Sequence, residues 1–271
     1  MRQGGSAPAL TDEEVLTREL GGEYCKLPTD KALFVYLRTP YAPFLPPLPA
    51  RPLFVRHATP LGQGKAASPQ RLTPGRGQAP APGQLLDTLA RPVCGSPRRG
   101  RERGFTPVAD SGPCAAKNLD YSGFKLGVRR ARGGMITCGP VLPARPPDLP
   151  LWAERVEGFA GRVPADKGFS AAFRQARLAE RQGVFVVTAP RQGLTTPHRP
   201  PRLKACARRR KGSEPVGAPL TERFAVARLR VHELWHFQQR LIRQVRAHTV
   251  GVVLNLQPGQ PALDLDGLVT V

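Results

Sequence analysis

The chain is 271 residues long, carries a formal net charge of +21 and is 40% hydrophobic. Its 31 prolines and 28 glycines make up about 22% of the residues, near the composition of low-complexity sequence, so one compact domain over the whole length is not expected. The hydrophobic residues suffice for a folded part. No apolar run approaches the roughly 18 residues of a membrane span, so no transmembrane segment is expected.

Arginine carries most of the positive charge, with 33 Arg against 8 Lys. The planar guanidinium pairs with phosphate through two parallel hydrogen bonds and stacks on bases, and each neutralised phosphate releases counterions. The composition therefore favours a nucleic acid as partner. Because a GC-rich coding strand also produces many Arg and Ala codons, a reading frame under little functional constraint stays open as an alternative.

The five cysteines lie far apart, without the close spacing of a metal or redox motif. Their odd number and the lack of an apolar segment near the N-terminus argue against a secreted disulfide framework. Residues 1–20 contain several acids, unlike an organelle transit peptide. We expect an intracellular protein without a visible cleavable targeting segment; an organelle or the nucleus is possible.

Residues 1–39 predict a short helix and a strand. Thr11 is a typical N-cap, acids follow it, and Gly21 is a typical end, so a helix is expected over 12–20. Aromatic and β-branched residues in ALFVYLR, residues 32–38, favour a strand.

Residues 40–150 predict an extended Pro/Gly/Arg-rich region with little regular structure. Arginines interleaved with glycine could follow an irregular phosphate path here. The aromatic residues Phe105, Tyr121 and Phe124 lie near them and could stack on bases, although a solvated loop would have the same pattern. The candidate RNA contacts are Arg98, Arg99, Arg101, Arg103, Arg129, Arg130 and Arg132.

Residues 151–271 predict a small α/β or α+β module, a long amphipathic helix with about three strands. Apolar spacing favours helices over 151–159 and 169–182, with Gly183 ending the second. GVFVVTAP then predicts a buried strand that ends at Pro190. The basic run that follows would bind phosphates, serve as a nuclear import signal, or form a solvated loop. Its candidate contacts are Arg208, Arg209, Arg210 and Lys211.

Residues 221–248 predict the long amphipathic helix of this module. Its apolar face contains Phe224, Ala227, Val231, Leu234, Trp235, Leu241, Ile242 and Val245. The remaining surface is basic, which suits a helix lying between a protein core and a polyanion, and it contains Arg223, Arg228, Arg230, Arg240, Arg243 and Arg246. TVGVVLNLQ and ALDLDGLVTV then predict two strands around a turn.

The helix contains HELWH, residues 232–236, which resembles the HExxH motif of zincin metalloproteases over these five residues. The resemblance implies His232 and His236 as zinc ligands and Glu233 as general base. No third ligand follows at the family's spacing, and Arg240 and Arg243 would raise the cost of binding a divalent cation. An ordinary helix surface is therefore the preferred interpretation. A catalytic, structural or adventitious zinc site is the alternative.

Together these patterns predict a non-enzymatic RNA-associated protein, a subunit of a large ribonucleoprotein assembly such as a ribosome, without a cofactor or an evident small-molecule substrate. Its partners would be RNA and neighbouring proteins, with the N-terminal half taking its shape from the polyanion. In composition the chain resembles the extended basic proteins of ribosomes. A zinc metallopeptidase and a nuclear interaction protein are the alternative hypotheses.

Overall fold

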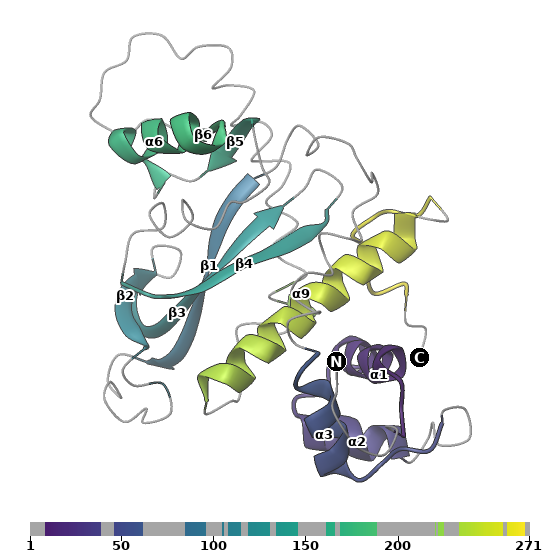
Figure 1. Ribbon diagram of the computed structural model, residues 1–271. Helices are drawn as coiled ribbons and strands as arrows, with labels where there is room; N and C mark the ends of the chain where they lie inside the picture. Colours follow the sequence, from purple (N-terminus) through teal and green to yellow (C-terminus); the bar gives the residue numbers. More distant parts are fainter. Residues whose placement is uncertain are drawn as a thin grey trace.

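The computed structural model has a mixed α+β fold, which confirms the expected class, with helices beside one sheet (Figure 1). A long helix near the C-terminus is also confirmed. The structure describes residues 9–38, 46–61, 85–95, 105, 108–114, 119–130, 134–145, 161–165, 169–188, 220, 222–224, 233–256 and 259–268.

Helix α1, Asp12–Tyr24, begins where the sequence predicts. The Thr11 side chain accepts from the backbone N–H of Glu14, and the Glu14 carboxylate accepts from the N–H of Thr11, which forms a capping box. The expected end at Gly21 is wrong, because the helix continues to Tyr24. This extra turn positions the last residues of α1 against the C-terminal helix.

The segment expected as a strand is helix α2, Asp30–Arg38, so that prediction is wrong. Thr29 is the missed start signal: its hydroxyl accepts from the N–H of Ala32 at 3.1 Å, as an N-cap does. Leu33 and Phe34 then turn inward. Burial of one helical face thus outweighs the strand preference of a short aromatic run.

Helix α3, Arg51–Ala58, lies in the region expected to be extended. Pro52 stands in its first turn, where proline is compatible with a helix. Helices α1, α2 and α3 enclose a small core of their own and form one helical unit (Figure 1). The buried side chains of this core are Leu10, Val15, Leu33, Phe34, Phe54 and Ala58.

The described part of residues 40–150 also contains four strands and so differs from the expected lack of regular structure. Strand β1, Leu85–Gly95, and β3, Leu119–Arg130, are antiparallel. Strands β2, Asp110–Cys114, and β4, Ile136–Pro143, pair with successive parts of β3.

Glycine and proline within these strands hid them from sequence analysis. Gly123 of β3 has φ +154°, and a Cβ built there would lie 2.3 Å from the carbonyl oxygen of Arg91. The register of β1 against β3 shifts nearby, between Pro92 and Cys94. Glycine is therefore needed where the two backbones meet at a bulge.

Helix α9, Leu234–Leu256, packs against β4 on one side and α1 on the other (Figure 1). It confirms the predicted helix over 234–248. The expected start at residue 221 is wrong, because Arg223, Phe224 and Glu233 form turns or bends and α9 begins at Leu234, within HELWH. Residues 225–232 lie outside the described residues. The two strands expected after it are wrong: TVGVVLNL forms the last turns of α9, and residues 259–268 are turns and irregular backbone. The Thr249 hydroxyl donates to the carbonyl of Ile136 at 2.7 Å, which ties these last turns to β4.

Strand β5, Gly161–Ala165, helix α6, Ala172–Gln182, and strand β6, Val184–Thr188, form a parallel βαβ unit. Gly183 ends α6 with φ 66°, which confirms the predicted helix end, and β6 lies within the predicted strand. The expected helix over 151–159 lies outside the described residues. Strand β5 joins β1, which gives the order β2-β3-β1-β5-β6 with β4 on β3.

In the part of the chain that the structure describes, every helix is too short or too polar to cross a membrane.

Candidate functional site

Most of the predicted nucleic-acid contacts lie outside the described residues. For Arg130 the structure describes the backbone alone, as part of β3. The predicted residues outside the described ranges are Arg98, Arg99, Arg101, Arg103, Arg132, Arg208, Arg209, Arg210, Lys211 and the motif residue His232.

Arg129 lies in β3, between Leu86 of β1 and Thr137 of β4 in the register of the sheet. Burial lowers the pKa of its guanidinium from the ordinary value. A half-buried arginine within a sheet differs from the flexible basic loop that the sequence suggested. Its role as an RNA contact stays a prediction.

The three aromatic residues for which base stacking was one of two interpretations are buried. Phe105, Tyr121 and Phe124 are all less than 5% exposed. The rings of Phe105 and Phe124 pack on Phe237 of α9, with centroids 6.0 and 5.3 Å from it. These rings therefore belong to the core between the sheet and α9.

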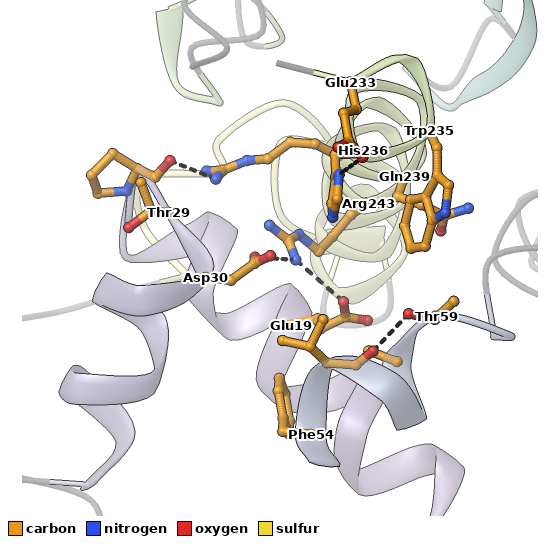
Figure 2. A pocket seen from close by; sticks show the side chains of 14 residues that line it. Glu19, Thr29, Asp30, Phe54, Thr59, Glu233, Trp235, His236, Gln239 and Arg243 are labelled. Atoms are coloured by element: carbon orange, nitrogen blue, oxygen red, sulfur yellow. Dashed lines mark hydrogen bonds and ion pairs between the residues drawn. The ribbon is translucent and has the colours of Figure 1, made fainter. Parts of the chain in front are cut away.

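A cleft of about 360 Å³ opens between the first turns of α9 and the helical unit α1–α3 (Figure 2). Its lining mixes charged and apolar side chains. Acids come from α1, from α2 and from Glu233, which directly precedes α9, and arginines come from α9. Those that matter for the site's chemistry are Glu19, Asp30, Glu233, His236, Arg240 and Arg243.

Arg243 is buried and joins three acids. Its Nε donates to Oε1 of Glu23 at 2.5 Å, and its Nη1 donates to Glu19 at 3.2 Å and to Asp30 at 3.0 Å. Burial by itself would lower the pKa of Arg243, but the attraction of Glu23, Glu19 and Asp30 outweighs it and raises the pKa above its ordinary value. This guanidinium is therefore a fixed cation that holds α9 to the helical unit.

Arg240 is also used internally. It donates to the carbonyl oxygens of Pro28 and Leu27, each at 2.6 Å, and its Nε lies 3.3 Å from Glu23. Burial is the main reason that its pKa lies below the ordinary value, with Glu23 opposing that shift. The expectation that this arginine faces a polyanion is therefore corrected: its hydrogen bonds go to the loop between α1 and α2.

A third arginine of the predicted basic helix face is buried as well. Arg223 pairs with Asp266, and its guanidinium lies over the ring of Tyr24, 5.4 Å from the centroid. The acids that pair with these arginines stand far from them in the sequence. Sequence analysis, which compared charges along one helix, had no signal for the pairing.

In HELWH the structure describes Glu233 and His236 but not His232. Oε2 of Glu233 lies 3.2 Å from Nδ1 of His236, and the Trp235 ring stacks on His236 with centroids 4.7 Å apart. Both partners of this pair are largely exposed. Within the described ranges no three His, Cys, Asp or Glu side chains gather to hold a metal.

Charge is divided unevenly along the chain. Residues 1–60 and 220–271 together contain 10 acidic and 13 basic residues, so they are nearly balanced. Residues 61–219 contain 10 acidic and 28 basic residues. The segments that form the helical unit and α9 thus contribute little to the net charge.

Helix α6 presents an exposed basic face that sequence analysis missed. Arg174, Arg177 and Arg181 are exposed and follow the spacing i, i+3, i+7, which places them on one side of the helix. Glu180 is the one acid of this helix. The sequence contains this arginine spacing. The prediction for this segment relied on its apolar residues, which indicate a helix but not its basic face.

The βαβ unit also exposes two aromatic rings. Phe173 of α6 is 80% exposed and Phe185 of β6 is 54% exposed. Arg162 of β5 is exposed beside Phe185. The expected burial of the strand GVFVVTAP therefore applies to Val184 and not to Phe185.

No protein-family model, no curated protein and no solved structure matches this chain.

Proposed function

We propose that the chain is a non-enzymatic RNA-associated protein, an intracellular subunit of a ribonucleoprotein assembly, that binds RNA backbone through its arginine-rich segments. The observation that supports this most is the division of charge. Acids of α1 and α2 pair with arginines of α9, whereas the positive excess lies in residues 61–219.

The internal pairs decide which cations are offered to a partner. A guanidinium that is buried among carboxylates, such as that of Arg243, has no net charge to offer to phosphate. The arginines of α6 differ, because they are exposed and face solvent along one side of a helix. From Arg174 to Arg181 they span about 10 Å of the helix axis.

The exposed face of α6 therefore joins the segments already predicted from sequence as phosphate contacts. These segments are residues 98–103, 129–132 and 208–211. Binding of this kind is mainly electrostatic and tolerates many RNA sequences, because phosphates carry no base information.

Filter binding of the full chain to a structured RNA, over a series of salt concentrations, tests the proposal. We expect the affinity to fall steeply as salt rises, with log K linear in log salt and a slope of about −0.7 to −0.9 for each phosphate neutralised. Weak binding that does not change with salt would remove the proposal. It would favour the alternative of a reading frame under little constraint.

The compartment and the assembly are part of the same proposal. Replacement of Arg208, Arg209 and Arg210 by Ala separates two possibilities for the basic run. If the run contacts RNA, the variant binds RNA with a smaller salt slope in vitro and stays in its original compartment. Loss of nuclear accumulation with unchanged RNA binding would instead identify the run as an import signal.

A further inference from the structure

We propose that the face of β5 and β6 opposite α6, centred on Phe185 and Arg162, is a stacking platform for unpaired bases of RNA. This inference rests on the proposed function and goes further, because it names the place on the molecule and the form of RNA that is bound.

The sheet register places the two side chains together. Arg162 of β5 pairs in register with Phe185 of β6, and the strands are parallel. Neighbouring residues in register project from the same face of a sheet, and adjacent strands lie about 4.8 Å apart. A guanidinium and a phenyl ring, both flat and both exposed, therefore stand side by side.

This face is not the one that α6 covers. Val163 follows Arg162 in β5, and Val184 precedes Phe185 in β6. Both valines are buried and pack with Leu178 of α6. Because side chains alternate between faces along a strand, Arg162 and Phe185 point to the other face. The fold thus buries these two valines and leaves Phe185, an aromatic residue, exposed to solvent.

The charge of the sequence on either side of Phe185 favours a polyanion over an apolar protein partner. From Arg181 to Ser213 the sequence contains nine basic residues and no acid. Strand β6 lies within this stretch, and Thr188 at its end is covalently joined to the segment that bears most of these cations. A ring set in such a stretch can stack on a base while neighbouring cations neutralise the phosphates.

Single-stranded RNA fits this arrangement better than a duplex does. In an A-form helix the bases are paired and stacked on each other, so an exposed side chain of a sheet has no base face to contact. Unpaired nucleotides can turn their bases outward onto an aromatic ring or an arginine plane. We therefore expect a preference for loops and ends.

The control is Leu53 of α3, an exposed apolar side chain on the helical unit. It is 50% exposed, close to the 54% of Phe185. Leu53→Ala, like Phe185→Ala, removes exposed apolar surface and no charge. A difference between the two variants therefore depends on the position of Phe185 and not on the loss of apolar surface alone.

The experiment measures binding of the full chain to a short unpaired RNA and to the same strand in a duplex. We expect Phe185→Ala to weaken binding of the unpaired RNA about 5- to 100-fold with the salt slope unchanged, because the ring carries no charge. Arg162→Gln should reduce the slope by about 0.7. RNA binding by Leu53→Ala, and duplex binding by Phe185→Ala, should match the wild-type chain.

If Phe185→Ala does not fold, Phe185→Leu replaces it: the apolar bulk stays, the ring is lost, and we expect the same weakening. Wild-type binding of RNA together with an unaltered Phe185→Ala or Phe185→Leu variant overturns the platform while the proposed function stands. It would assign this face to a protein partner. An equal loss in Leu53→Ala overturns the platform too, and absence of salt-dependent RNA binding by the wild-type chain overturns both proposals.

Discussion

Nε of Arg243 donates to Oε1 of Glu23 at 2.5 Å, which joins the last helix to the first across 220 positions of sequence. Both side chains are buried. Removal of one partner of a buried ion pair leaves an uncompensated charge, which is more damaging than loss of the attraction alone. The contact therefore makes α9 and the helical unit depend on each other.

Arg243→Met should lower the free energy of unfolding by about 3–5 kcal/mol, because it leaves the carboxylates of Glu19, Glu23 and Asp30 without their shared cation. Urea denaturation followed by circular dichroism measures the loss. Arg177→Met, on the exposed face of α6, is the control and should change stability by less than about 0.5 kcal/mol. If both substitutions lowered the free energy of unfolding equally, the buried ion pairs of Arg243 would stabilise the fold no more than an exposed arginine does.

Tyr24 should make stability decrease in alkaline solution. Burial is the main cause that raises its pKa from 10.0 to about 12, while the charge of Arg223 opposes the shift. Since the folded chain holds this proton more tightly than the unfolded chain, the contribution is complete below pH 10 and disappears as the pH rises through about 12. Its size is up to about 3 kcal/mol.

Absorbance titration of tyrosine ionisation measures this shift. The wild-type chain should show a phenol that ionises late, and Tyr24→Phe should lose that step from the titration curve. If Tyr24→Phe kept the late step and lost an early-ionising tyrosine, the assignment of the late step to Tyr24 would be contradicted.

Gly251 of α9 should not tolerate a side chain. A Cβ built there would lie 1.8 Å from the hydroxyl oxygen of Tyr24, which donates to the carbonyl of Ala247 at 2.8 Å. Gly251→Ala should therefore destabilise the fold by about 1–3 kcal/mol, although alanine favours helices. Thermal unfolding checks this, and the Tyr24→Phe background should recover part of the loss.

Gly21 of α1 provides the matched control. It is also helical, but a Cβ built there meets nothing within 4 Å. Gly21→Ala should stabilise the chain by about 0.5–1 kcal/mol. If Gly251→Ala were equally stabilising, the close approach of Tyr24 to α9 would be wrong.

The HELWH segment should bind zinc only weakly. Glu233 contacts His236, and among the described residues no three His, Cys, Asp or Glu side chains gather to hold a metal, whereas a zinc site needs at least three protein ligands. We expect purified chain to contain far less than one zinc per molecule by elemental analysis. Stoichiometric zinc that is lost in Glu233→Gln and His236→Ala would revive the metallopeptidase hypothesis.

Sequence analysis succeeded where the signal is local. The capping residue Thr11 and the helix-ending Gly183 were both identified correctly, because a cap depends on residues a few positions away. The α2 helix was missed because ALFVYLR is too short to show a helical period and Thr29 was not recognised as its cap. The end of α9 was missed because packing on β4 outweighs the strand preference of valine.

The candidate sites could be predicted only in part for a related reason. Sequence shows that arginines are numerous, but not which of them meet acids from distant segments, as Arg240 and Arg243 do. Nor does it show that Phe124 is buried while Phe185 is exposed. Both distinctions arise from contacts between residues far apart in the chain, which composition and spacing do not encode.

The most direct test of the account compares two variants with the same loss of charge. One replaces Arg174, Arg177 and Arg181 of α6 by Gln, and the other replaces Lys31, Arg51 and Arg56, which are exposed on the helical unit. The account predicts that the α6 variant lowers the salt slope of RNA binding by about 2, while the helical-unit variant binds as the wild-type chain does. Equal slopes and equal affinities for the two variants would contradict it.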